Sequence, residues 1–186
     1  MKKITLLVFL MSTSSTFLFS KEQFIFKDTS KVKIPRFYKN EIGNSKCSAY
    51  FPIQKPKIDV SYSEDSSIVY TFDELIGEYH FSMIHIDLAN NINDSLEQQT
   101  VLINYSNYLQ GLFKAVESME YGLGHTLSSD SKTQGLIGFW IDSDKTEYAM
   151  KSWINANHLT VFLIYGKGEY PYYNVKEMFF NGIKYK

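Results

Sequence analysis

The stretch Leu159-Thr-Val-Phe-Leu-Ile-Tyr-Gly166 decides the fold class of this chain. Its apolar residues lie on both faces of a predicted strand, with Leu159, Val161, Leu163 and Tyr165 on one face and Phe162 and Ile164 on the other. A strand that is apolar on both faces is covered on both sides, so it lies inside a sheet and not at its edge. The sequence therefore predicts a central strand at about 157–166.

The rest of the chain from Cys47 onward has apolar residues mostly at a period of two, in short runs separated by Gly, Asn, Asp and Ser. This pattern is typical of antiparallel strands joined by hairpins. It predicts six further strands, at about 47–51, 67–75, 78–88, 120–128, 134–142 and 146–155. In the strand at 78–88 the apolar residues change face near Met83, which predicts a β-bulge there.

One long stretch departs from this period and favours a helix. Asp94 precedes Glu97 by three residues, close to the spacing of a capping box. The apolar residues that follow recur at helical spacing and are Leu102, Tyr105, Leu109, Leu112, Phe113, Val116 and Met119. The spacing predicts an amphipathic helix that packs one apolar stripe on the sheet.

A second, short helix is predicted near the C-terminus, where Asn174 and Glu177 repeat the capping spacing. Its apolar residues are Val175, Met178, Phe179 and Ile183. The predicted fold class is α+β: an antiparallel β-sheet packed against one long amphipathic helix, with a short C-terminal helix. The predicted core includes Leu109, Leu112, Val116, Phe139, Leu163 and Phe179.

The order of these elements resembles that of the PsbP-like superfamily. The residues that carry the resemblance are Cys47-Ser-Ala-Tyr-Phe-Pro52, Gly135-Leu-Ile-Gly138, Leu159 to Gly166 and Met178-Phe-Phe-Asn-Gly-Ile-Lys184. That superfamily includes the extrinsic PsbP protein of photosystem II, a nuclear-import factor that binds the GTPase Ran, and small bacterial exported proteins. The resemblance covers residues 47–186 and implies a binding or assembly module without a catalytic role.

The N-terminus has the pattern of a secretory signal peptide. Lys2 and Lys3 precede the apolar stretch from Ile4 to Met11, and the chain turns polar at Ser20. Residues 4–19 are shorter and more polar than the ~20 apolar residues of a spanning helix, although an uncleaved anchor is the alternative. We therefore expect residues 1–20 to be removed near Ser20 and the mature chain to be periplasmic or secreted.

Charge divides the mature chain into two parts. The full sequence has 19 basic and 20 acidic side chains, which gives no overall attraction to nucleic acid. Residues 21–46 nevertheless form a basic lead-in to a single domain at 47–186. This lead-in is either a solvated segment or an arm that touches a membrane surface or a partner. We expect a protein partner in the cell envelope.

Few residues of the chain carry the chemistry of an active site. The single cysteine, Cys47, excludes an intramolecular disulfide, and we expect it to be buried in a strand and unreactive. His85 and Asp87 share a face of the predicted strand at 78–88, where Asp73 from the neighbouring strand could join them around a metal ion. A solvated polar face is the alternative interpretation.

No nucleophile elbow and no phosphate-binding glycine motif occurs in the sequence. We therefore predict a protein that is not an enzyme and needs no cofactor. The alternative is a metal-binding protein or metal-dependent hydrolase that uses the face of His85 and Asp87.

The segment Gly166-Lys-Gly-Glu-Tyr-Pro-Tyr-Tyr-Asn174 is the candidate recognition loop. Its side chains Tyr170, Tyr172, Tyr173 and Lys167 form an aromatic surface of the kind enriched in binding interfaces. The other interpretation is that these rings fold back over the edge of the sheet and cover the core.

Overall fold

The computed structural model describes residues 35–167 and 173–185. The predicted signal peptide, most of the basic lead-in and part of the recognition loop lie outside the described residues.

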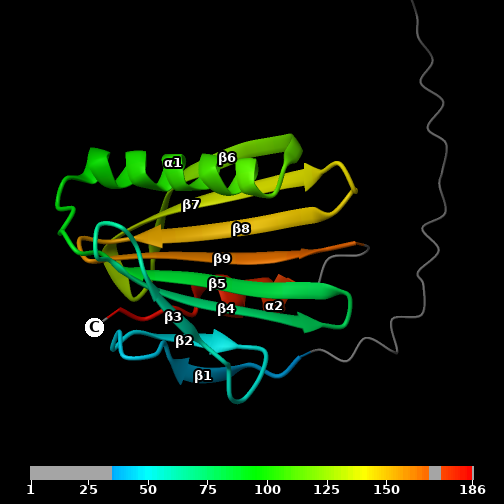
Figure 1. Cartoon of the computed structure of the whole chain (residues 1–186), viewed down its shortest axis with the longest axis horizontal. Helices are drawn as coiled ribbons and strands as arrows, with labels where there is room; N and C mark the ends of the chain where they lie inside the picture. Colours follow the sequence, from blue (N-terminus) through cyan, green and yellow to red (C-terminus); the bar gives the residue numbers. More distant parts are fainter. Residues whose placement is uncertain (1–34, 168–172, 186) are drawn as a thin grey trace, which may run out of the picture. The chain divides into compact units, whose positions relative to one another are not determined.

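A seven-stranded sheet in the order β3-β4-β5-β9-β8-β7-β6 is the centre of the structure, and all its neighbouring strands are antiparallel (Figure 1). The strands are β3 (Asp59–Tyr62), β4 (Ile68–Ile76), β5 (Tyr79–Asp87), β6 (Ala115–Leu127), β7 (Asp130–Asp142), β8 (Glu147–Ile154) and β9 (His158–Gly166). The central position of β9 confirms the prediction from its two apolar faces. A separate two-stranded ribbon joins β1 (Tyr38–Glu41) to β2 (Ser48–Phe51).

The two faces of β9 belong to two different cores. Phe162 and Ile164 lie in a core formed with the β1-β2 ribbon and α2 (Tyr173–Asn181). Leu159, Val161 and Leu163 lie in a second core with buried residues of α1 (Ser95–Leu112). Figure 1 shows α1 running along β6, β7 and β8, with α2 on the other side of the sheet. The fold is therefore α+β, with an antiparallel sheet and two helices.

The predicted bulge near Met83 is wrong. The register of β5 runs without interruption along both β4 and β9, from Tyr79 to Asp87. Apolar residues appear on both faces of β5 because this strand, like β9, lies inside the sheet. Met83 is buried in the α2 core, and Ile84 packs against the α1 core.

The long helix is shorter than predicted. Asp94 does cap its first turn, since its side chain accepts a hydrogen bond from the backbone N–H of Glu97 at 2.8 Å. The helix ends at Leu112, and Lys114 adopts a left-handed φ of 53° that turns the chain into β6. Val116 and Met119 therefore belong to a strand.

Three of the predicted core residues, Leu109, Leu163 and Phe179, are buried, and Phe139 is partly buried. Leu112 and Val116 are exposed, at 58% and 59%, so their placement in the core was wrong. For Val116 the error follows from the end of α1 at Leu112, because later residues no longer share a helical stripe with Leu109, whereas Leu112 belongs to α1 but lies outside its buried stripe.

The C-terminal helix α2 forms as predicted and packs through Val175 and Phe179. The indole N–H of Trp153 on β8 donates a hydrogen bond to the carbonyl of Phe180 at 2.6 Å, which ties the end of α2 to the sheet. Two elements were not predicted: β3, and β1, which includes residues of the basic lead-in and pairs with β2. Within the described residues, neither helix has both the length and the apolar character that crossing a membrane requires.

Candidate metal centre

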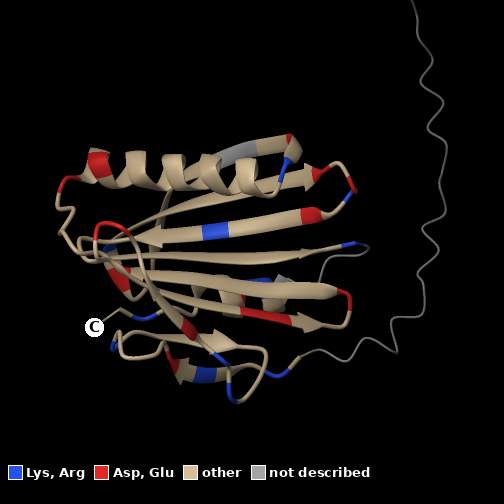
Figure 2. Cartoon of the chain, in the orientation of Figure 1, with Lys and Arg blue, Asp and Glu red and all other residues tan. Residues whose placement is uncertain are grey.

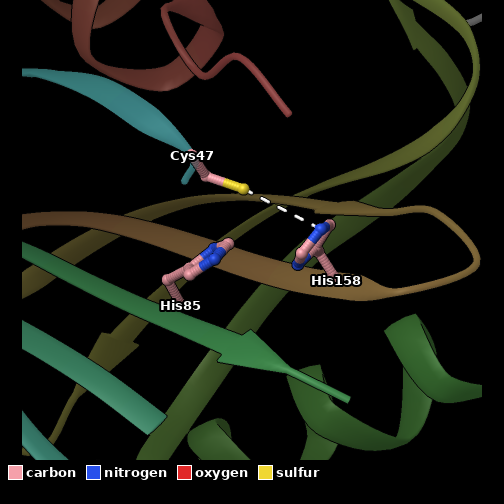
Figure 3. A group of neighbouring side chains, drawn as sticks. All are labelled: Cys47, His85 and His158. Carbon is pink, nitrogen blue, oxygen red and sulfur yellow. Dashed lines mark hydrogen bonds between the residues drawn. The ribbon is translucent and has the colours of Figure 1, made fainter. Parts of the chain in front are cut away.

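Three potential metal ligands converge where β2, β5 and β9 meet (Figure 3). Cys47 immediately precedes β2, His85 lies near the end of β5, and His158 is the first residue of β9. The register of β5 and β9 sets His85 opposite Thr160 and Asp87 opposite His158. Pairing between two strands that are distant in the sequence thus assembles the cluster.

The cluster is compact and almost closed to solvent. One ligand atom from each of Cys47, His85 and His158 lies within 4.8 Å of the other two. The sulfur of Cys47 is 3.8 Å from Nε2 of His158. Cys47 and His85 have no exposed surface, and the side chain of His158 is 12% exposed. An ion held here would be surrounded by protein on most sides.

Asp87 determines how the two imidazole rings are protonated. Its Oδ1 lies 2.9 Å from Nδ1 of His158 and 3.1 Å from Nε2 of His85. Partial burial raises the pKa of Asp87, but the hydrogen bonds and charges of His85 and His158 outweigh that effect and lower the pKa overall. Asp87 is therefore ionised at neutral pH and can only accept, so both of these ring nitrogens carry a proton and donate.

With Nδ1 of His158 donating to Asp87, Nε2 is the ring nitrogen that faces the sulfur of Cys47 and that could bind an ion. A carboxylate behind the protonated nitrogen of a metal-binding histidine fixes the ring orientation and increases the basicity of the ligating nitrogen. His158 and Asp87 already have this arrangement.

His85 is neutral and fully hydrogen-bonded. Burial lowers its pKa, against the opposing effect of Asp87. Since Nε2 of His85 donates to Asp87, its Nδ1 accepts from the hydroxyl of Thr160 at 2.7 Å. Thr160 in turn accepts a hydrogen bond from the hydroxyl of Tyr185 at 2.8 Å. To ligate a metal without first losing a proton, His85 would use Nδ1 and exchange its hydrogen bond from Thr160 for the ion.

The C-terminal segment covers the cluster. The ring of Tyr185 stacks on that of His158, with centroids 5.4 Å apart and planes 5° apart, and lies 6.2 Å from that of His85. Two backbone hydrogen bonds between Ser48 and Lys184 fix this segment beside β2. Tyr185 therefore closes the site on one side.

The spacing of the donors suits a thiophilic ion. With metal–sulfur and metal–nitrogen bonds of about 2.3 and about 2.0 Å, a tetrahedral angle of about 109° at the ion separates the two donor atoms by about 3.5 Å. The observed 3.8 Å between Cys47 and His158 is about 0.3 Å longer than this separation, so a small movement of the two side chains would admit an ion. One thiolate and two imidazoles suit Zn²⁺ or Cu⁺, whereas Mg²⁺ and Ca²⁺ prefer oxygen ligands.

The structure brings together two of the three metal candidates named from the sequence. His85 and Asp87 share a face and are hydrogen-bonded, as expected. Asp73 lies on the opposite face of the sheet, where its carboxylate contacts Nδ1 of His80 and accepts from the hydroxyl of Tyr165. Asp73 therefore belongs to a separate cluster.

Sequence reasoning missed Cys47 and His158 as members of the site. The signal that could have found them is the pairing of β5 with β9, which sets His158 opposite Asp87. Periodicity predicts each strand but not which strand lies beside it.

Of the proposed recognition loop, Tyr170 and Tyr172 lie outside the described residues, as does the side chain of Tyr173, the first residue of α2. Lys167 is exposed and lines a shallow cleft of about 500 Å³ together with His80 and Tyr165.

Comparisons of the chain with protein-family models, with curated proteins and with solved structures gave no match. A function can therefore be inferred only from the residues of the site and from the order of the elements.

Proposed function

We propose that this chain is an exported, non-enzymatic metal-binding protein that holds Zn²⁺ or Cu⁺ between Cys47, His85 and His158. One observation carries the proposal: a thiol and two imidazoles converge within 4.8 Å in a buried site, with Asp87 orienting both rings. The donor set is one that borderline and soft cations prefer.

Burial favours holding an ion over using Cys47 as a nucleophile. A nucleophilic thiol must reach its substrate, and Cys47 has no exposed surface. A catalytic metal likewise needs an open coordination position that a substrate can reach. Tyr185 and the buried surroundings of His85 restrict that access.

The order of the elements supports a relationship to the PsbP-like superfamily, and we infer the same kind of binding role. A signal peptide at residues 1–20 would carry the mature chain to the periplasm or the outside of the cell, where an envelope protein would be its partner. In that compartment a bound ion would also protect the single thiol from oxidation, because it occupies the sulfur lone pairs.

Metal titration of the chain, purified under reducing conditions, tests the proposed site. We expect one equivalent of Zn²⁺ or Cu⁺ to bind in competition with a chromophoric chelator, and Co²⁺ to show sulfur-to-cobalt charge-transfer absorption. Cys47→Ser and His158→Gln should each weaken binding by roughly a hundredfold or more, because each removes a ligand. His80→Gln is the matched control on the opposite face of the sheet and should bind as the parent does.

Binding that is unchanged in folded Cys47→Ser would overturn the proposal, and so would a parent protein that binds neither ion. Export is tested separately by the intact mass of protein recovered from the cell envelope. A mass that begins near Lys21 supports cleavage, and a mass that retains residues 1–20 contradicts it.

A further inference from the structure

Lys151 on β8 is a buried cation in a sheet whose inner strands carry few charges (Figure 2). The residue is 8% exposed, and its ammonium lies 4.7 Å from the centre of the Trp153 ring. Burial lowers the pKa of Lys151, while the nearby charge of Glu177 acts in the opposite direction. Among the described residues no carboxylate lies within ion-pair distance of this ammonium. A desolvated cation of this kind attracts an anion.

Lys151 lines a cleft of about 370 Å³ between β8, the turn after β6 and the end of α2. The hydroxyl-bearing residues Ser128 and Ser129 line the same cleft, with Glu177 and Asn181 from α2. Serine hydroxyls can donate to an anion beside Lys151. The volume lies at the small end of the range of ligand pockets.

Asn181 supplies a second, independent indication of a ligand. Its amide nitrogen donates to the carboxylate of Glu177, so its Oδ1 is the remaining acceptor. This oxygen is buried and has no hydrogen-bond partner within residues 35–167 and 173–185. A buried acceptor without a partner favours a ligand that brings an N–H or O–H donor.

We propose that this cleft binds a free α-amino acid. The carboxylate of the ligand lies against Lys151 and the serine hydroxyls, and its ammonium group donates to Oδ1 of Asn181 beside the charge of Glu177. Trp153 and Leu127, which line the cleft, leave an apolar wall for the ligand side chain. Lys151 and Lys184 line the cleft and attract a carboxylate, while the negative charge of Glu177 favours a ligand that also carries a cationic group. This proposal shares no residue with the metal centre and does not depend on it.

Calorimetric titration with four probes tests the proposal on the full chain. The probes are L-leucine, 4-methylpentanoate, which lacks the ammonium group, 3-methylbutylamine, which lacks the carboxylate, and inorganic phosphate. We expect saturable binding of L-leucine. Each of the other three probes should bind at least roughly tenfold more weakly than L-leucine, since each lost charged contact is worth about that factor.

Lys151→Met removes the charge and keeps most of the side-chain volume, so we expect L-leucine affinity to fall at least roughly tenfold while the melting temperature does not decrease. Asn181→Ala should also weaken binding, and it provides the test if Lys151→Met does not fold. Lys167→Met, which changes an exposed lysine in another cleft, is the control and should bind as the parent does.

Three outcomes would overturn the proposal. They are the absence of L-leucine binding to the folded parent, unchanged affinity in folded Lys151→Met or Asn181→Ala, and tighter binding of phosphate than of L-leucine. The last outcome would replace the amino acid with a simple oxyanion as the ligand.

Discussion

Nδ1 of His158 donates a hydrogen bond to Oδ1 of Asp87 across 2.9 Å, and the opposite nitrogen of the same ring faces the sulfur of Cys47 at 3.8 Å. Asp87 on β5 and His158 on β9 are paired directly across the two strands, so the sheet itself fixes the orientation of the His158 ring. An ion that enters the site would therefore meet a ligand whose ring is already oriented.

Asp87→Asn should weaken metal binding by about 10–100-fold while all three ligands remain. The amide can still accept a hydrogen bond, but it no longer provides the negative charge that makes Nε2 of His158 more basic. The measurement is competition with a chromophoric chelator, for Zn²⁺ and for Cu⁺.

The chain contains a matched control for this substitution. Asp73 is paired with His80 at 2.8 Å on the opposite face of the sheet, so Asp73→Asn removes the same kind of carboxylate–imidazole contact away from the ligands. We expect unchanged metal affinity in Asp73→Asn, and an equal loss in both variants would show that Asp87 has no special role.

The stability of the metal-free protein should fall as the pH drops from 7 toward 5. Burial lowers the pKa of His85 in the folded state, whereas the unfolded chain binds the proton near the usual value of about 6.5. Between the lowered pKa and about 6.5 the unfolded state binds more protons, so the free energy of unfolding decreases with decreasing pH. Asp87 acts in the same direction at lower pH, since its pKa is also lowered.

Urea denaturation at a series of pH values measures this dependence. His85→Gln should flatten the curve between about pH 5 and 7, because the group that titrates there has been removed. An equally steep curve in His85→Gln would assign the dependence to other groups, with His125 the first to examine because burial lowers its pKa as well.

Leu109→Ala should destabilise the protein by ~2–5 kcal/mol, because it leaves a cavity between α1 and the sheet. Leu112→Ala should change the stability by only ~0.5 kcal/mol or less, because Leu112 is 58% exposed. The two substitutions remove the same atoms three residues apart on one helix. Similar melting temperatures for the two variants would contradict the burial of Leu109 and the exposure of Leu112.

The start of α1 can be predicted from the sequence better than its end. Asp94 caps the helix through its own side chain, which is a local interaction and can be recognised from residue type. The end depends on Lys114, a residue in a left-handed conformation that no glycine or proline marks. Beyond it, Val116 and Met119 keep the spacing of three residues that is typical of a helix, although both lie in β6.

The sheet and the metal centre differ in predictability for a related reason. The run of apolar residues along β9 predicts that this strand is central, because consecutive residues point to opposite faces and both faces are apolar. The cluster depends on which strand is adjacent to β9 and on the β1-β2 ribbon that places Cys47 over it. His85 and Asp87 lie two residues apart on one strand, so their shared face could be predicted, whereas the position of His158 could not.

Tyr185→Phe should lower the stability by ~0.5–1.5 kcal/mol and leave metal affinity nearly unchanged. The substitution removes the hydroxyl that donates to Thr160 but keeps the ring that stacks on His158.

Tyr185→Ala removes the ring as well and uncovers the site, so we expect faster release of the ion to a chelator. Thermal unfolding and stopped-flow chelation measure the two effects separately. Tyr62→Ala, at a tyrosine that is 74% exposed on β3, is the control for both. If Tyr185→Ala releases the ion no faster than Tyr62→Ala does, the C-terminal segment does not control access to the metal centre.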